Sequence, residues 1–208
     1  MLALTILPSF ILAAALIEIT PGPNMAYLAH VALSQGRMAG FAAVAGVALG
    51  LGIIGILAAL GVGALIDGSP LAYQLMRWLG AAYLLWLAWE AWRQSGDDDA
   101  DKPGKVAGLM PLFWRGLITN LLNPKAAVFY VAMLPQFVHV ELGRTTWQLA
   151  ILTAANVAVA TTIHLGIVLM ADRVRSALAK AQAMNRIRQG LALSLVAVAI
   201  WFLVSTAR

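Results

Sequence analysis

The sequence predicts an all-α integral membrane protein with six membrane-spanning helices. Of the 208 residues, 62% are hydrophobic and only 11% are charged, and the mean hydropathy is +0.84. A soluble domain of this size needs more charged residues to cover its surface. The charged residues also cluster between long apolar runs, which lack the alternation of apolar and polar residues typical of a membrane β-barrel. Helices are the remaining way to satisfy the backbone inside lipid.

Six apolar runs of about 18 residues or more are long enough to cross a hydrocarbon core of roughly 30 Å as helices. They cover residues 2–20, 39–66, 70–92, 112–134, 147–171 and 189–206. The first run lacks a basic N-terminal region and a cleavage context, so we interpret it as a retained helix rather than a signal peptide.

The chain is predicted to form a single domain, residues 1–208, built from two halves of three spans. An acidic linker at 95–110 separates the half at 1–94 from the half at 111–208. Homologous halves with an odd number of spans must lie in opposite orientations, which gives an inverted repeat. We interpret the aspartates of the linker as a solvated loop, and we expect no metal and no cofactor.

Basic residues indicate the orientation of the chain. Ten Lys and Arg residues lie near the connections at 21–38, 93–111 and 172–188, and three lie near the opposite side. The positive-inside rule therefore predicts a cytoplasmic location for these connections and places both termini outside. This topology explains the net charge of +5 better than nucleic acid binding does. The chain contains no cysteine, which excludes disulfides and thiolate metal sites.

Pro21-Gly22-Pro23 is the sharpest local feature, and Asn24 follows it directly. Two prolines remove two backbone donors and glycine adds freedom, so an α-helix cannot continue through these residues unbroken. One interpretation is a kink or the end of the first helix. The other is a broken helix whose free carbonyls and amides line a solute cavity. The spacing alone favours neither.

Asn123-Pro124-Lys125 interrupts the fourth span and predicts a second broken helix. Even on a lenient scale, a lysine at the centre of a span costs about 2.5–3.5 kcal/mol. Asn120 and Asn123 lie within a turn and can satisfy exposed backbone groups. We favour a Lys125 side chain that faces a cavity, where it can pair with a substrate carboxylate or with Glu18. The alternative is a Lys125 side chain that extends to the membrane interface.

Glu18 is the one carboxylate placed clearly inside a predicted span. A carboxylate there is expensive when ionised, so Glu18 is a candidate for carrying a proton, for binding a substrate ammonium or for pairing with Lys125. His164 and Asn156 in the fifth span are weaker candidates. A single histidine in a span serves equally well as a hydrogen bond between helices.

Glycines of the second span match a nucleotide-binding pattern that we reject. Gly50-Leu51-Gly52-Ile53-Ile54-Gly55 fits G-x-G-x-x-G, but no strand precedes it. Glycines at four-residue spacing permit close approach of helices in lipid and suggest a possible homo-oligomer contact; they are Gly36 with Gly40 and Gly46 with Gly50. The chain has no ATP-binding P-loop pattern.

The segments at 19–50, 76–93, 113–138 and 184–195 resemble the LysE/RhtB family of amino acid exporters. The P-G-P-N motif at 21–24 and the N-P-K motif at 123–125, followed by L-P-Q-F at 134–137, carry the resemblance. It implies a bacterial inner-membrane transporter that expels amino acids or their derivatives, driven by the proton gradient as an antiporter. The resemblance also implies positions that the family keeps, namely Pro21, Gly22, Pro23, Asn24, Asn123, Pro124 and Lys125. Together with Glu18, Asn120 and Asn156, they are our candidates for substrate binding. Glu18 and His164 are the candidates for proton coupling.

Family members handle basic, neutral and hydroxylated amino acids and homoserine lactone. Glu18 is the one acid placed inside the membrane, and it offers a single partner for the two positive charges of a dibasic substrate. We therefore expect a small neutral amino acid as the substrate. Two other classes of function are alternatives to export. A membrane enzyme needs a nucleophile, paired acids or a metal cluster, and the sequence offers no such constellation. A non-transport subunit or scaffold would use the glycine-rich helix faces as contact surfaces.

Overall fold

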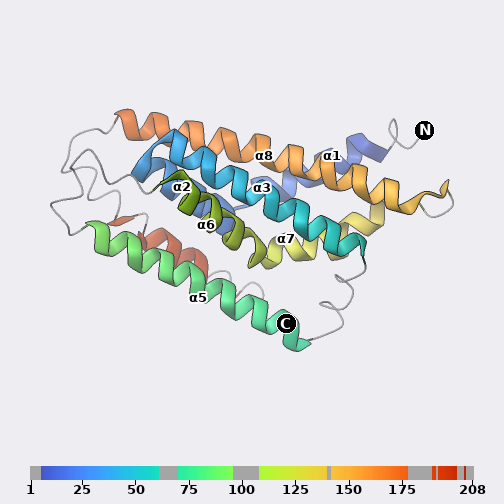
Figure 1. Cartoon of the computed structure of the whole chain (residues 1–208), viewed down its shortest axis with the longest axis horizontal. Helices are drawn as coiled ribbons and strands as arrows, with labels where there is room; N and C mark the ends of the chain where they lie inside the picture. The colour runs from blue at the N-terminus through green and yellow to red at the C-terminus, as the bar shows by residue number, and fades with distance from the viewer. Residues whose placement is uncertain are drawn as a thin grey trace.

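The protein is an elongated bundle of helices, shown as a computed structural model in Figure 1. The structure describes residues 6–60, 70–95, 108–139, 142–177, 189–190, 192–200 and 204. Every regular element in these ranges is helical, which confirms the all-α prediction. Most of the acidic linker, residues 96–107, and most of the basic stretch at 172–188 lie outside the described residues.

The first predicted break separates α1 (Ile6–Ile19) from α2 (Pro23–Gln35). Pro21 has no N–H for the carbonyl of Ile17, which accepts instead from the backbone nitrogen of Thr20 at 3.1 Å. Gly22 is fully extended, with φ −169° and ψ 180°, and Pro23 begins α2 in the position where a missing N–H costs nothing. The helix therefore stops and restarts within three residues.

The second predicted break separates α6 (Leu109–Leu121) from α7 (Pro124–Val128). Asn123 is extended, and its side-chain Oδ1 accepts a hydrogen bond from the backbone nitrogen of Lys125 at 3.0 Å, which caps α7. The chain continues as the π-helix η2 (Phe129–Met133) and the 3-10 helix η3 (Leu134–Phe137). Across this break the helical axis bends by 55°.

Three further long helices belong to the bundle, and residues 192–200 are helical as well, with Leu195 and Ala199 buried in the core. α3 (Arg37–Ala59) follows a corner at Gly36, whose φ of 87° suits glycine. α5 (Pro70–Ser95) runs along one side of the bundle in Figure 1, and α8 (Thr145–Ala177) crosses its whole length. α3 lies at the centre, because it packs on α2, α6 and α8. The buried residues of α8 recur every three or four positions from Gln148 to Ala171, so one face of the helix points into the bundle.

The predicted count of six spans exceeds what the described helices support by length and composition. α3 and α8 are each long and apolar enough to cross a membrane, and α6 with Lys125–Phe137 is a third candidate if the bent pair is one span. α1 has only 14 residues, and α5, with 26, carries Gln74, Arg77 and Glu90. The remaining spans and the inverted repeat stay predictions.

The glycines of α3 pack inside this chain. A Cβ atom at Gly46 would collide with the backbone of Phe113, and one at Gly116 would collide with the backbone of Ala43, so α3 and α6 touch through their main chains. Gly40 lies against the side chain of Val168 on α8, which a Cβ atom there would meet. These contacts occupy the faces that suggested a homo-oligomer, and close packing within the bundle explains the four-residue spacing instead.

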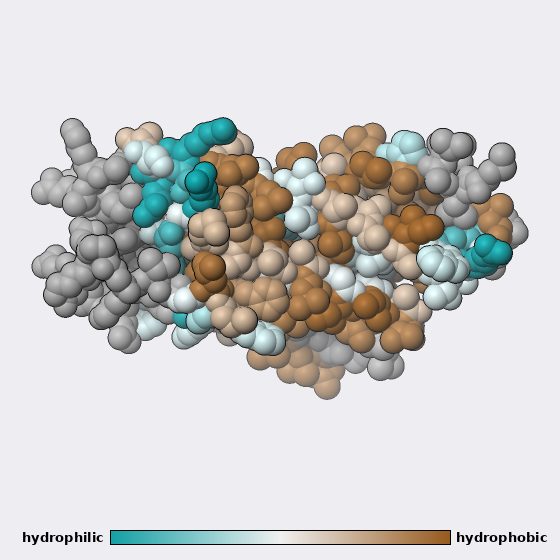
Figure 2. Space-filling model, turned by 45° about the horizontal axis from the view of Figure 1, so that its top comes forward, coloured by the Kyte–Doolittle hydropathy of each residue, from teal (hydrophilic) through white to brown (hydrophobic). Residues whose placement is uncertain are grey.

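The surface matches a protein whose sides face lipid. Figure 2 shows apolar residues around the middle of the molecule and hydrophilic residues toward both ends, most of them at the end where α3 begins and α8 ends. Many large apolar side chains are exposed, among them Leu12, Ile56, Trp89 and Met170. An apolar surface of this extent is unusual for a protein surrounded by water.

Candidate functional site

The two helix breaks meet at a polar cavity. Its lining comes from four helices and consists of Glu18, Gly22, Asn24, Met25, Asn123, Lys125, Ala126 and His164. The space left between these side chains admits about one water molecule. The site is therefore closed in this conformation, and a larger solute can enter only after the helices around it move apart.

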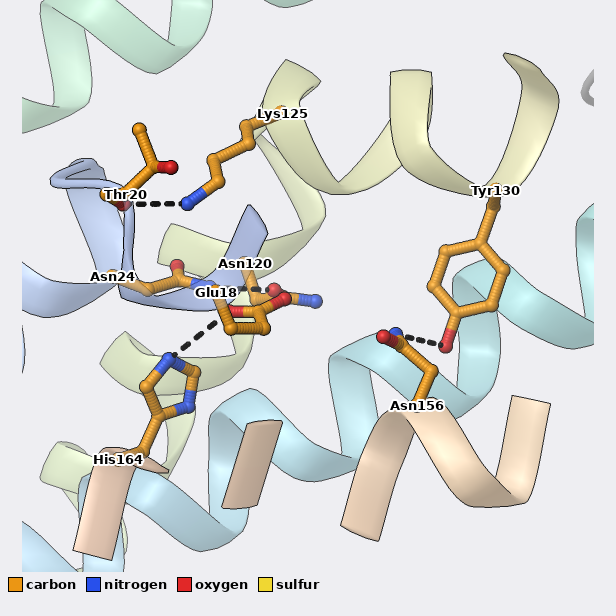
Figure 3. Close-up of polar contacts among 8 residues, drawn as sticks. All are labelled: Glu18, Thr20, Asn24, Asn120, Lys125, Tyr130, Asn156 and His164. Atoms are coloured by element: carbon orange, nitrogen blue, oxygen red, sulfur yellow. Dashed lines mark hydrogen bonds and ion pairs between the residues drawn. The ribbon is translucent and has the colours of Figure 1, made fainter. Parts of the chain in front are cut away.

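Lys125 carries the positive charge of the cavity. It is half-buried, and its Nζ donates a hydrogen bond of 2.7 Å to the backbone carbonyl of Thr20 at the end of α1 (Figure 3). The lysine stem passes Gly22, where an added Cβ would lie 3.5 Å from Cδ. The Lys125 ammonium group, at the second break, thus binds the Thr20 carbonyl, which the first break leaves without a hydrogen-bond partner inside a helix.

Glu18 and His164 form the opposite wall of the cavity. Their Oε2 and Nε2 atoms lie 3.5 Å apart, which is a contact between an acid and a base rather than a short hydrogen bond. Glu18 is 8% exposed and His164 is 1% exposed. Figure 3 shows them on the far side of Asn24 from Lys125. Among the described residues, Glu18 pairs with this histidine and not with Lys125.

Asn24 and Asn120 join the two halves of the chain behind the cavity. Nδ2 of Asn24 donates to Oδ1 of Asn120 at 2.9 Å, and both side chains are buried. This bond leaves Oδ1 of Asn24 and Nδ2 of Asn120 without a partner in the described part of the chain. One acceptor and one donor therefore remain unused beside the cavity, although buried polar groups are normally paired.

The start of α2 adds backbone donors to the same place. No side chain caps this helix end, so the first amides of α2, at Asn24 and Met25, lie where a helix attracts an anion. α7 differs, because Asn123 already accepts from the amide of Lys125. The side of the cavity that holds Lys125 and the start of α2 therefore has the electrostatics to attract an anion.

The remaining sequence-based candidates do not line the cavity. Pro21 is exposed, and Pro23 is buried at the start of α2. The backbone of Pro124 begins α7. Asn156 bonds to Tyr130, with 3.1 Å between its Nδ2 and the tyrosine oxygen.

Sequence reasoning overlooked Thr20, Met25, Ala126 and Tyr130. Thr20 acts through its backbone carbonyl, which no side-chain pattern reveals. Met25 and Ala126 each lie two residues beyond the proline that begins their helix, and this spacing is the signal that was available. Tyr130 lies on an apolar segment, where a tyrosine looks like part of the core.

The cavity has the charges of a site for a small zwitterion. Lys125 and the start of α2 suit a carboxylate, and Glu18 suits an ammonium group. In the part of the chain that the structure describes, no three His, Asp or Glu residues cluster as metal ligands would. The chemistry available there is binding and proton exchange.

Comparison with known proteins identifies the family of this chain. The chain is 31% identical over 166 residues to the homoserine/homoserine lactone efflux protein of Salmonella typhimurium, with 80% of each chain covered. It is 32% identical over 158 residues to the leucine efflux protein of Enterobacter sp., covering 76% of this chain and 72% of that protein. No solved structure matches the chain significantly. Residues 15–206 match the family described as LysE type translocators, and the chain belongs to that family.

Proposed function

We propose that this protein exports small neutral amino acids across the bacterial inner membrane as a secondary transporter. The observation that carries the proposal is the closed cavity between the two helix breaks, with Lys125 on one side and Glu18 with His164 on the other. A free amino acid carries one carboxylate and one ammonium group, and this cavity offers a partner to each.

The relatives support this substrate class. Two of them are named as efflux proteins for homoserine, its lactone and leucine, which are small and carry no charged side chain. The cavity lining contains a single carboxylate, which already contacts a histidine. A second ammonium group, as in lysine, would find no further acid there.

The closed cavity suggests how binding opens the protein. In the structure Lys125 bonds to the carbonyl of Thr20, a neutral acceptor. A substrate carboxylate is a stronger acceptor for an ammonium group, so it would displace Thr20 and free the end of α1 from α7. A substrate that favours one arrangement of the helices in this way shifts the population toward it.

Glu18 and His164 are the groups that would couple export to protons, as an antiporter requires. Protonation of Glu18 would remove the charge that holds a substrate ammonium, and His164 is placed to exchange that proton. A change of one charge in a narrow, largely buried site changes the affinity for a charged ligand strongly. Proton entry would thus release the amino acid.

We extend the proposal to the topology. Six spans forming a single domain, with broken first and fourth spans as an inverted repeat, would place both breaks at the membrane midplane, where transporters of this type bind substrate. Arg37, Arg173 and Arg175 lie where α3 begins and α8 ends, and Arg144 lies near the opposite end of α8. The positive-inside rule then places the first group in the cytoplasm, with both termini outside.

Reconstitution in proteoliposomes tests this function. We expect transport of leucine and homoserine that depends on a pH gradient and that neither the amide nor the deaminated analogue of leucine inhibits, since each lacks one of the two charges. Lys125→Ala and Glu18→Gln should both reduce export, and Lys125→Ala should also weaken binding of the amino acid. Wild-type export by both variants would show that the site is wrong, and absence of any amino acid transport would refute the function.

A further inference from the structure

Two glycines of α3 lie directly against buried polar side chains. A Cβ atom at Gly50 would lie 2.7 Å from Nδ2 of Asn120, and the next two nearest atoms also belong to Asn120. A Cβ atom at Gly55 would lie 2.8 Å from Cε1 of Tyr130 and would also collide with Thr153. Gly52, between them, has nothing within 4 Å of the same position. The G-x-G-x-x-G pattern thus contains two glycines that contacts require and one that they do not.

The side chains that face these two glycines belong to polar pairs of the same form. Asn156 donates from Nδ2 to the oxygen of Tyr130 at 3.1 Å, as Asn24 donates to Asn120. Oδ1 of Asn156 has no partner among the described residues. Asn156 is 0% exposed and Tyr130 is 1% exposed. Each pair therefore keeps unused hydrogen-bonding capacity in an apolar interior, where unpaired polar groups call for an explanation.

The Tyr130–Asn156 pair lies away from the cavity but along the same helix. Asn156 and His164 both belong to the buried face of α8, and their separation of eight residues corresponds to about 12 Å along the axis. Tyr130 lies on the π-helix η2, an irregularity that occurs frequently at functional sites. Figure 3 shows the pair apart from the group formed by Glu18, Asn24 and Lys125.

We propose that Tyr130 and Asn156 form a second polar binding site on the export path, which we call the station. Gly50 and Gly55 are positioning residues, because they let α3 lie against both polar pairs. This inference rests on the proposed function. The ligand of the station is the polar head of the amino acid in transit, or the water that accompanies it. A neutral hydroxyl and amide suit this role, because a station on a path must bind well enough to admit a solute and weakly enough to release it.

Removal of the Tyr130 hydroxyl tests the station. We expect Tyr130→Phe to lower the maximal rate of leucine export about tenfold, the effect of one hydrogen bond lost in transit, with little change in KM. Tyr27→Phe is the matched control, since it removes another buried hydroxyl, 3.4 Å from the carbonyl of Leu112. It should export at the wild-type rate. A Tyr130→Phe rate within a factor of two of wild type would overturn the proposal.

A double variant separates transport from stability. Tyr130→Phe with Asn156→Leu replaces both partners by apolar groups, which restores or raises thermal stability when a pair is merely structural. We expect its thermal stability to match wild type while export stays slow. Recovery of export together with stability would mean that the pair only holds the helices, and would overturn the station.

Alanine at each glycine tests the positioning role. Gly50→Ala and Gly55→Ala should slow export at least about tenfold, and Gly52→Ala on the same helix should not, because only the first two would displace a polar side chain. If Gly50 acts through Asn120, then Gly50→Ala should have a much smaller effect in an Asn120→Ala background. Equal effects in both backgrounds would refute the assignment. If the wild type exports amino acids and all these variants match its rate, this inference alone is refuted. If the wild type exports none, the proposed function is refuted and the station with it.

Discussion

Lys125→Met removes the charge of the cavity and keeps most of the apolar stem. The ammonium bonds to a carbonyl 2.7 Å away, and loss of a hydrogen bond to a charged group costs about 1.5–3 kcal/mol. A lysine at the centre of a span itself costs about 2.5–3.5 kcal/mol. Because the two contributions are similar and opposite, we expect the free energy of unfolding to change by no more than about 1 kcal/mol.

Export should change far more than stability. If Lys125 binds the substrate carboxylate, its loss removes about 1.5–3 kcal/mol of binding, which corresponds to a decrease of about 10-fold to about 150-fold in kcat/KM. We would measure initial rates of leucine export in proteoliposomes and thermal unfolding by tryptophan fluorescence in the same preparation.

The control for this variant is Arg173→Met. Arg173 is exposed on α8 and does not line the cavity, so this variant also loses one positive charge but should export normally. Export by Lys125→Met at the wild-type kcat/KM would refute the carboxylate assignment. A large loss of thermal stability in Lys125→Met would instead show that the bond to Thr20 holds the helices together.

Three further outcomes are expected. Glu18→Gln should abolish the dependence of export on the pH gradient and weaken binding of the amino acid, since glutamine keeps the shape but neither the charge nor the proton. Gradient-driven accumulation by this variant would contradict the coupling role. Asp172→Ala should lower the free energy of unfolding by about 1 kcal/mol, because its Oδ1 accepts from the backbone nitrogen of Arg37 at 3.0 Å and thereby caps α3; an unchanged midpoint of thermal unfolding would contradict this. Gly46→Ala should prevent stable folding, because the new Cβ would meet the backbone of Phe113. Gly166→Ala has open space around the new Cβ, so helix propensity should raise its free energy of unfolding by up to about 1 kcal/mol. Similar melting temperatures for the two variants would show that α3 and α6 are not in backbone contact.

The breaks in the helices were predictable from local covalent chemistry. Proline lacks the N–H that a helix needs, so Pro21, Pro23 and Pro124 predict interruptions wherever these segments are placed in space. The cap of α7 by Asn123 follows from the same local rule. The cost of a charge in lipid likewise singled out Lys125 and Glu18 before any fold was known.

The partners of these residues were not predictable. The sequence left open a pair between Glu18 and Lys125, yet the structure places His164, 146 positions along the chain, beside Glu18 and gives Lys125 a backbone carbonyl. Both choices depend on how α8 and α7 cross α1. The glycines of α3 are a similar case, because their spacing permits close packing but does not say whether the neighbour is another copy or α6 and α8 of the same chain.

The sequence by itself thus determined the all-helical membrane architecture, the two broken helices and the residues too costly to lie in lipid without a role. Hydrophobicity, proline geometry and charge desolvation act on each segment locally, and a sequence records them directly. Only the tertiary structure decided that the breaks meet at one closed cavity, that its acid faces a histidine and its lysine a carbonyl, and that Tyr130 joins Asn156. Those are relations between segments distant in the chain, fixed by helix packing, which no single segment encodes.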